Sequence, residues 1–586
     1  MEKRRRNKPL SWLAVTVMVV VGVVMTAMPV AAFEFSLSDG EVTGYLDTTL
    51  SYALGIRTGD PVSDSNLPKA NIRDYTFDQG EIYSNQFKAS PELELKWKNY
   101  GFFGRASVYW DTRIEQSSSD QRGYFLAPEE LGLPGNGNGW SDDAHDDIGF
   151  GSELYDFYVY GGYEVENMLG LGYSPIDIRL GNQAFNWGEG SFYLDGINTT
   201  NALDFNKLSL PGSEIKEATI AVPAISVQMG IGDNLALDAY YQFGWSETKL
   251  PPAGTFFDGG YNFLGRDGKY SMFPMDLSYL TGDPADAGIF IPMLDNTRRS
   301  DDDASDSGQF GFAAHYNLEN MELGAYFVNF HSQLPIFQYN VPVWDPENDP
   351  YGEQYYLDNR MTLKYVEDVQ MYGVSLATTV GDWALGAEVA YKPDAPVVNI
   401  DLGQASIEQS GFYDTPPYDG SFYMTNNGLA KAGTSVDAYD EMDIWHGQIN
   451  LMKQFGAAPL GIDTTWVFLT AAVDHLPGDL DGLASIAPEQ EPDEFAWGYS
   501  VDVDSTWFNV LPGFDVTPGF SWMHGVDGYS HFWGNWWEDR KTLQLRVGAT
   551  YGTQWNFGID YNQEFNDEND YAENGSTANF SVSYNF

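Results

Sequence analysis

Cysteine is absent from this sequence of 586 residues, and basic residues are scarce, with 30 Lys and Arg against 84 Asp and Glu. Without cysteine the chain forms no disulfide and carries no thiol chemistry. The formal net charge of −54 at pH 7 argues against nucleic acid and anionic lipid as partners. Solvated acidic loops are the simplest explanation of this acidity. Divalent-cation binding and a cation-preferring pore are the two functional alternatives.

Long hydrophobic runs are missing after the first 32 residues. Residues 3–8 are strongly basic, Trp12 to Met28 form an apolar core, and Val30-Ala31-Ala32 supplies small residues. This pattern predicts a secretory signal peptide over residues 1–32, cleaved before Phe33. An uncleaved anchor is the alternative, and the small-residue site argues against it. Beyond Phe33 no stretch approaches the roughly 20 apolar residues of a membrane helix. We therefore expect residues 33–586 to form a single domain.

Alternation of apolar and polar residues is the strongest pattern that the sequence does contain. At the C-terminus Phe580, Val582, Tyr584 and Phe586 alternate with polar residues, which predicts a strand with one apolar and one polar face. Similar alternation predicts about eighteen strands in all. They lie near residues 42–57, 87–98, 102–113, 152–165, 174–184, 216–229, 234–248, 308–318, 321–333, 368–380, 383–393, 441–454, 462–475, 495–508, 513–525, 541–552, 554–566 and 576–586.

Connection lengths decide what kind of β protein this is. Short connections, such as 99–101 and 381–382, follow the even-numbered predicted strands, and long ones, such as 114–151 and 249–307, follow odd-numbered strands. Short periplasmic turns alternating with long extracellular loops are typical of bacterial outer-membrane barrels. We therefore predict an all-β, transmembrane antiparallel outer-membrane β-barrel of 16–18 strands. Its terminal Phe586 is expected to serve as an assembly signal, read by the barrel-assembly machinery.

One long stretch is similar to a known family. From Ile176 the chain reads IDIRLGNQAFNWGEGSFYLDGINTTNALDFNKLSLPGSEIKEATIAVP, and SDSGQFGFAAHY follows from Ser305. With further stretches along nearly the whole mature chain, these resemble the domain of unknown function 1302 family of proteobacterial outer-membrane proteins. The resemblance implies a barrel in the outer membrane, and such genes often lie beside genes for degrading or moving hydrophobic compounds. His531-Phe532-Trp533 departs from the Gly/Pro-rich turn usual in that family.

The connection from Leu180 to Glu217 is the candidate functional segment, because it is too aromatic for a solvated loop. We predict that it folds into the barrel mouth as a constriction or lid; a surface loop packed on itself is the alternative. Its charged residues are expected to form ion pairs or to meet a polar end of a substrate. The candidate lumen and constriction residues are Arg179, Gln183, Phe185, Trp187, Glu189, Phe192 and Lys216 from this region, with Arg105 and Asp111 on the lumen face.

Catalytic and cofactor motifs are not recognisable. None of the seven histidines lies in an HExxH or paired-histidine pattern, and no G-x-S-x-G sequence occurs. In the pairs His331-Ser332 and Ser530-His531, adjacent residues would point to opposite faces of a strand, which is poor geometry for a nucleophile and its base. No spaced calcium-loop pattern appears in the Asp-rich loops. We therefore predict no enzyme, no cofactor and no bound metal.

Passage of solutes is the function that these features favour. Sixteen or more strands enclose a lumen wider than side chains can fill. We predict an outer-membrane channel for small hydrophobic or amphipathic organic compounds. The alternatives are a general or cation-preferring porin and a structural barrel without transport. Expected partners are outer-membrane lipid, a small hydrophobic solute, and a periplasmic or inner-membrane transport partner.

Overall fold

The structure is a computed structural model of the whole chain. It describes residues 33–37, 40–60, 77–116, 144–166, 173–190, 193–252, 255–257, 272–275, 289–292, 301–340, 360–399, 422–425, 428–431, 435–483, 491–532, 535–565 and 575–586. The predicted signal peptide and Phe192 lie outside these residues. Within the described part of the chain, no helix is both long enough and apolar enough to cross a membrane.

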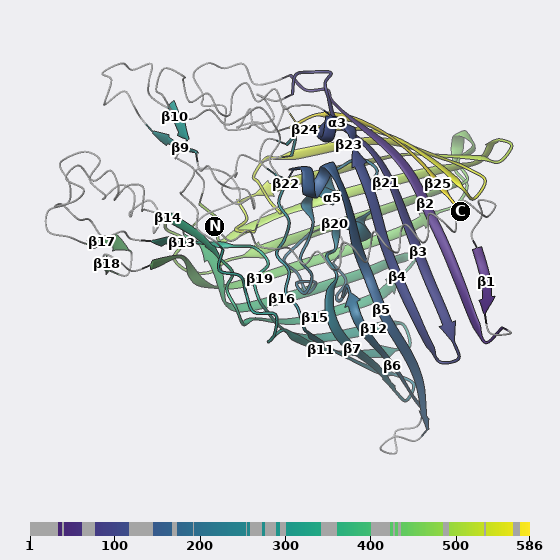
Figure 1. Cartoon of the computed structure of the whole chain (residues 1–586), viewed down its shortest axis with the longest axis horizontal. Coiled ribbons are helices and arrows are strands. Elements are labelled where there is room, and N and C mark those ends of the chain that lie inside the picture. Colours follow the sequence, from purple (N-terminus) through teal and green to yellow (C-terminus); the bar gives the residue numbers. More distant parts are fainter. Residues whose placement is uncertain are drawn as a thin grey trace.

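Eighteen strands form one closed antiparallel barrel (Figure 1). Each pairs with its neighbours along the chain, and the last pairs with the first. In order around the ring they are β2 (Val42–Arg57), β3 (Ile82–Trp97), β4 (Tyr100–Asp111), β5 (Phe150–Glu166), β6 (Tyr173–Gln183), β7 (Val222–Ile231), β8 (Leu235–Gln242), β11 (Phe310–Leu318), β12 (Met321–Phe330), β15 (Val369–Val380), β16 (Trp383–Val398), β19 (Ser435–Phe455), β20 (Thr464–His475), β21 (Phe495–Leu511), β22 (Phe514–Asp527), β23 (Lys541–Tyr551), β24 (Trp555–Phe565) and β25 (Thr577–Asn585).

The seam between β2 and β25 closes the ring. Their register runs from Thr49 opposite Asn585 to Arg57 opposite Thr577. Thr48 and the terminal Phe586 then exchange backbone hydrogen bonds of 2.7 and 3.0 Å. Beyond that point the edge of β2 is covered by β1 (Phe33–Leu37), which pairs with residues 42–46. Nearly the whole length of β2 is therefore paired on both sides, so the seam leaves little open edge.

Inward and outward residues alternate as the sequence predicted. In β15 the outward Tyr372 and Val374 are 43% and 58% exposed, whereas the inward Met371 is fully buried. Aromatic residues mark both ends of the outer face: Trp97 and Tyr100 at the short turns, and the stacked pair Tyr391 and Trp445 at the opposite end. An apolar outer band bounded by aromatic residues is the surface that a bilayer requires of a transmembrane barrel.

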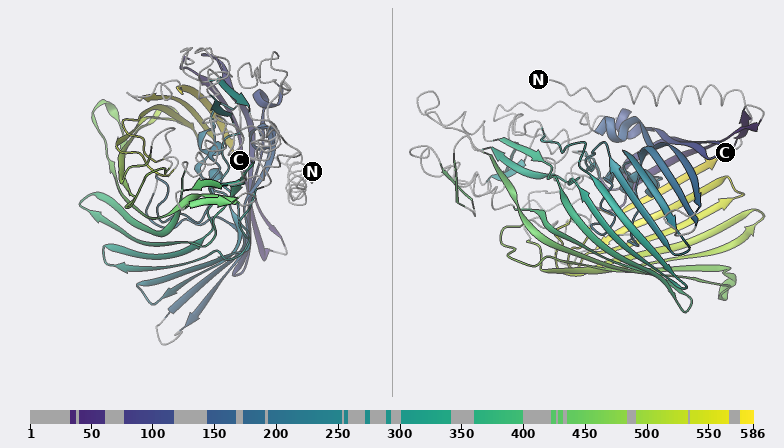
Figure 2. Two further views of the ribbon diagram at one scale, coloured as in Figure 1. Left: turned by 90° about the vertical axis from the view of Figure 1, so that its left-hand side faces the viewer. Right: turned by 90° about the horizontal axis from the view of Figure 1, so that it is seen from below.

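Long and short connections lie at opposite ends of the barrel. The short hairpins include Gly381-Asp382, where Gly381 adopts a φ of 64° that favours glycine. Strands β13 (Ile336–Asn340) and β14 (Arg360–Lys364) and the hairpins β9–β10 (Met272–Met275, Ile289–Pro292) and β17–β18 (Phe422–Thr425, Gly428–Lys431) belong to the long connections. They lie at the left of Figure 1, and β1 and the C-terminus lie at the right; the right-hand view in Figure 2 shows the same separation.

The structure confirms the predicted fold class, with the strand count at the upper limit of the predicted range. Strand boundaries differ most from prediction at three places, by six residues each. The strand expected near 216–229 begins only at Val222, because residues 215–218 form the short helix α6 (Ile215–Ala218). The strand expected near 234–248 ends at Gln242, and β19 begins six residues earlier than the predicted 441. The role of Phe586 as an assembly signal stays a prediction.

The topology predicts which side of the membrane each connection faces. Asp302 is exposed at the long-connection end, and the side chain of Asp382 is 83% exposed in a short turn. We expect a membrane-impermeant maleimide to label the Asp302→Cys variant on intact cells, and the Asp382→Cys variant only after permeabilisation. The natural chain has no cysteine, so it serves as a blank. Labelling of the Asp382→Cys variant alone on intact cells would mean that the barrel is oriented the other way.

Candidate functional site

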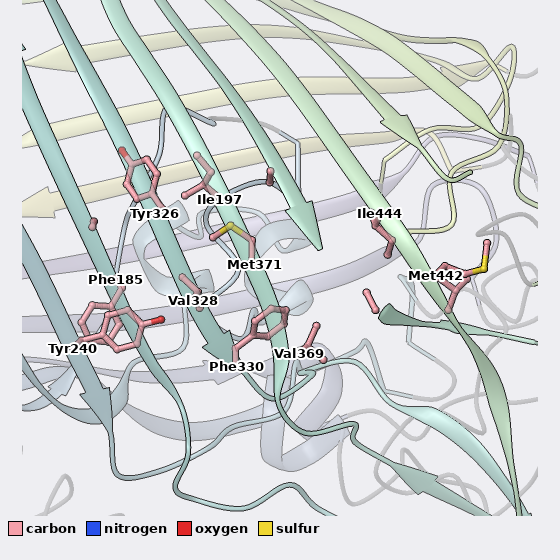
Figure 3. Close-up of a cluster of buried hydrophobic side chains, with 14 of the residues drawn as sticks. Phe185, Ile197, Tyr240, Tyr326, Val328, Phe330, Val369, Met371, Met442 and Ile444 are labelled. Atoms are coloured by element: carbon pink, nitrogen blue, oxygen red, sulfur yellow. The ribbon is translucent and has the colours of Figure 1, made fainter. Parts of the chain in front are cut away.

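The connection between β6 and β7, residues 184–221, folds inward and contacts the lumen face of the barrel wall. Its first part packs onto β8 and β12. The ring of Phe185 stacks on Tyr240 with centroids 4.2 Å apart, and Trp187 lies 4.9 Å from the same tyrosine. Figure 3 shows Phe185 and Tyr240 face to face within a cluster of buried side chains that continues to Met371 and Ile444. These aromatic residues attach the loop to the wall.

Glu388, on the lumen face of β16, binds the backbone of the loop. One carboxylate oxygen accepts the N–H groups of Glu189 and Gly190 at 2.6 and 2.7 Å, and the other accepts the N–H of Ile197 at 3.1 Å. Glu388 is only 4% exposed, so these donors supply the hydrogen bonds that water cannot. A Cβ atom at Gly196 would lie 2.2 Å from this carboxylate. Glycine is required there because the backbone and the carboxylate approach so closely.

Residues 193–197 form the tip of the loop. The ring of Tyr193 lies 4.1 Å from that of Trp536, and the backbone of Leu194 exchanges two hydrogen bonds with the side chain of Asn535 at 3.1 and 3.0 Å. Ile197 is fully buried against Gly373 of β15, where an added Cβ would lie 2.6 Å from its side chain. The tip therefore joins β15 and β16 to the connection between β22 and β23.

Asp195 holds the centre of the tip. Its carboxylate pairs with Lys392 of β16 and lies 3.3 Å from the imidazole of His531. Burial by itself raises the pKa of Asp195, but Lys392 and His531 outweigh burial and hold that pKa below its usual value. Because the pKa of Asp195 is lower in the folded protein than in the unfolded chain, the pairing of Asp195 with Lys392 and His531 stabilises the fold above about pH 4. That contribution is lost only as the pH falls through the lower folded-state pKa.

The second half of the loop is held by a buried cluster of charges beside α5 (Phe205–Ser209). Lys249 lies 2.7 Å from Glu153 of β5 and 3.4 Å from Asp204, which caps α5 by accepting from the N–H of Asn206. Burial lowers the pKa of Lys249, but Glu153, Asp204 and Asp147 outweigh burial and raise that pKa above its usual value. Lys249 is therefore charged and neutralises the carboxylates around it.

The end of the loop is bound to β3 and β4. Glu217 forms an ion pair of 2.5 Å with Lys88 of β3, and both side chains are at most 5% exposed. Lys88 also donates to the carbonyl oxygen of Gly212 at 3.0 Å. Arg105 of β4 donates to Asp156 at 2.8 Å and to the carbonyl oxygen of Lys216 at 3.1 Å. A buried ion pair with these extra hydrogen bonds is costly to break from one side only.

These contacts reach opposite walls of the barrel. Strand β3 is the second strand of the ring and β16 is the eleventh, so nine of eighteen positions separate them. Nine positions are half of the circumference. A single connection thus spans the lumen from Lys88 to Glu388.

A cavity of about 160 Å³ lies on the long-connection side of the loop tip. Asp195, Lys392 and His531 lie at one part of its wall. The remaining wall is mostly apolar, including Leu194, Phe330, Pro335, Ile336, Phe337, Val369, Val397, Ile444 and Phe532. Such a combination of apolar walls and a few polar groups is typical of small-molecule sites.

The predicted site residues occupy several different places. Phe185 is 8% exposed, so its ring faces the wall and not the open lumen. Gln183 lies in the wall, bonded to Ala224 and Ser226. Arg179 lies over the ring of Tyr158, outside the loop. Lys216 lies 2.8 Å from Glu92. Glu189 contributes its backbone N–H to Glu388.

Two of the predicted lumen charges lie in separate contacts. Arg105 holds the loop, as described above, but its partner is Asp156. Asp111 instead accepts from Ser84 and from the backbone N–H groups of Asn85 and Arg113. Phe192 lies outside the described residues.

Sequence reasoning missed Glu388 and Lys392, which hold the loop from β16. A signal existed, because both are polar positions four residues apart in a predicted strand and therefore share its lumen face. Sequence reasoning also gave no weight to Asp195, Asn535 and Lys88.

The hydroxyl group of Ser530 donates to Asp474, which also pairs with His446. A serine nucleophile would instead donate to its histidine.

The sequence matches the family described as "Protein of unknown function (DUF1302)" over residues 13–586. The chain belongs to this family. The match confirms the resemblance found in the sequence. No curated protein matches the chain.

Solved structures that are similar include three barrels. Two are OccAB4 and OccAB3 of Acinetobacter baumannii, each 10% identical, with TM-scores of 0.40 and 0.41; the alignments cover 93% of this chain and 98% and 99% of theirs. The third is OpdK of Pseudomonas aeruginosa, solved with vanillate, at 11% identity and a TM-score of 0.38, covering 93% of this chain and 98% of that one. The fold described above rests on strand pairing and not on these likenesses.

Removing the carboxylate of Glu388 should loosen the loop and leave the barrel closed. In a Glu388→Ala variant three backbone donors lose their acceptor, at a cost of about 1–3 kcal/mol. We expect hydrogen exchange at Gly190 and Ile197 to accelerate about ten- to a hundredfold. The control is Glu319→Ala in an exposed short turn, which should change nothing. Unchanged exchange at both amides in the Glu388→Ala variant would show that Glu388 does not hold the loop.

Proposed function

We propose that the protein is an outer-membrane channel for small hydrophobic or amphipathic organic compounds. The observation that supports this most is the loop of residues 184–221, which is bound to opposite walls of the lumen. An eighteen-stranded ring encloses more space than inward side chains can fill. A loop across that space narrows it, and a narrowed passage can discriminate between solutes where a wide one cannot.

The way in which the loop is held suits a constriction that stays inside the lumen. Glu388 and the Lys88–Glu217 pair hold it at opposite walls, and the contact of Asp204 with Lys249 holds it between them. Each of these contacts includes a carboxylate that is at most 4% exposed, so releasing the loop would leave a charge without a partner in surroundings of low dielectric. The loop is therefore a permanent part of the passage.

The chemistry of the cavity beside the loop tip supports solutes with an apolar body. Its wall carries Phe330, Ile336, Phe337 and Phe532 close to the charged groups at the tip. An apolar solute leaving water gains by contact with such side chains. A hydrated ion gains nothing from them. The cavity thus favours organic solutes over inorganic ions.

Two other functions, a porin and a structural barrel, can be tested against this one. A general or cation-preferring porin would agree with the acidic composition of the chain, and a structural barrel would carry no flux. On the wall formed by β21, β22 and β23, Arg546 lies between Asp502 and Asp504 and offsets one of their two negative charges. The direction of transport follows the solute gradient, because a barrel has no energy source.

Excision of the loop tests the proposal. The backbone of Phe185 is bonded at both its N–H and its carbonyl oxygen to the side chain of Asn201, so the two positions are adjacent. Residues 186–200 can therefore be replaced by a short Gly-Ser linker. We expect liposomes with the natural protein to swell faster in benzyl alcohol than in arabinose. The excised variant should lose this preference and conduct severalfold more current.

The control is Phe312→Ala, an outward residue that is 55% exposed. This variant should behave as the natural protein does. A large, cation-selective current that excision leaves unchanged would identify a porin. Lack of flux in both proteins would identify a structural barrel.

A further inference from the structure

The cavity beside the loop tip has an unusual distribution of charge. Of the described residues that line it, Asp195 is the one carboxylic acid and Lys392 the one lysine or arginine. The side chains of Lys392 and His531 are 4% and 5% exposed. The ammonium group of Lys392 and the imidazole of His531 both approach the same carboxylate. The cavity therefore already contains a complete carboxylate-binding site, occupied by a residue of the loop itself.

Lys392 cannot lose the carboxylate of Asp195 unless another anion replaces it. It donates to both the carboxylate and, at 2.8 Å, the carbonyl oxygen of Asp195. Ala395, Val397 and Ile444 line the same cavity and offer no charge. A buried ammonium without an anion is strongly disfavoured. The site thus requires one carboxylate, but nothing requires that this carboxylate belong to Asp195.

The backbone of Asp195 is held in an unfavourable conformation. Its φ is 74°, in the left-handed region that residues other than glycine rarely adopt. Aspartate tolerates this region better than most residues, yet the conformation still stores strain. The contacts with Lys392 and His531 keep it there. An anion that replaced the Asp195 carboxylate would let this strain relax.

We propose that a small apolar carboxylic acid binds this cavity, takes the place of the Asp195 carboxylate on Lys392 and His531, and thereby releases the loop tip. The inference rests on the proposed function and names its substrate class and its opening step. The apolar body of the ligand contacts Phe330, Ile336 and Phe532, and its carboxylate meets Lys392.

Release is confined to the tip. Residues 193–197 lose their central contact, whereas Glu217 keeps its pair with Lys88 and Asp204 keeps its contact with Lys249. Only the tip therefore moves, and the rest of the loop stays at its anchors. Neutral solutes of the same shape lack the group that competes with Asp195, so they enter the cavity and leave the tip bound. The channel would thus open to its own substrates.

Calorimetry on the full-length protein in detergent tests the binding step. The probes are benzoate, its neutral amide benzamide, and acetate, which has the carboxylate without the ring. We expect benzoate to bind about tenfold tighter than either, a difference of about 1.4 kcal/mol. Asp195→Asn removes the internal competitor, so benzoate should bind that variant about tenfold tighter still. Lys392→Met should lose the preference for benzoate over benzamide. Asp382→Asn, in an exposed short turn, is the matched control and should match the natural protein.

A second measurement follows the tip without altering the charges. In an Ile197→Cys variant the only thiol of the chain takes a fully buried position. Benzoate should accelerate its reaction with a maleimide about tenfold, and benzamide should not. Equal binding of benzoate and benzamide, or a labelling rate that benzoate leaves unchanged, would overturn the inference. Either result leaves the proposed function intact if benzyl alcohol still crosses the barrel, and that function fails separately if no organic solute crosses.

Discussion

A ring of eighteen strands encloses a lumen that its own inward side chains cannot fill, and this geometric constraint governs the rest of the structure. One connection, residues 184–221, enters the lumen and fills part of it. A loop so placed has no continuous sheet to pair with, so its backbone groups need other partners. Glu388 supplies an acceptor for three of them. Glycines at positions 190 and 196 let the backbone approach that carboxylate closely.

Charge replaces apolar packing along much of this loop. Glu217 with Lys88, Asp204 with Lys249, and Asp195 with Lys392 are pairs of opposite sign in which the carboxylate of the loop is buried. Such pairs contribute little net stability compared with apolar residues of similar size, but they are costly to break from one side. They fix the position of the loop more than they stabilise the barrel. The exchangeable pair is the one beside the apolar cavity, where another carboxylate has room to enter.

Much of the fold was predictable because each property of a barrel strand has a local signature. Period-two alternation located all eighteen strands, and the alternation of short and long connections gave the closed topology. One of the largest errors fell at the start of β7, directly after the inward loop. The predicted strand included residues 216–218, but Glu214 and Glu217 form a capping box that begins a helix there.

The site was only partly predictable, for a physical reason. Composition showed that residues 185–193 are too aromatic for a solvated loop. It could not show that the ring of Phe185 faces the wall, because that depends on Tyr240, far along the chain. Nor could it pair Glu217 with Lys88, which lies 129 positions away. Contacts between a loop and distant strands depend on the closed ring, and no local pattern records them.

The tip of the loop lies against the wall formed by β15 and β16, and a cysteine pair tests this placement most directly. Ile197 and Gly373 are in contact, and a Cβ at Gly373 would lie 2.6 Å from the Cγ1 atom of Ile197. A disulfide requires Cβ atoms about 3.5–4.5 Å apart, which this contact allows. In the Ile197→Cys, Gly373→Cys variant, isolated from the membrane under oxidising conditions, mass spectrometry should find the two peptides joined. Complete alkylation of both thiols would show that the tip does not reach this wall.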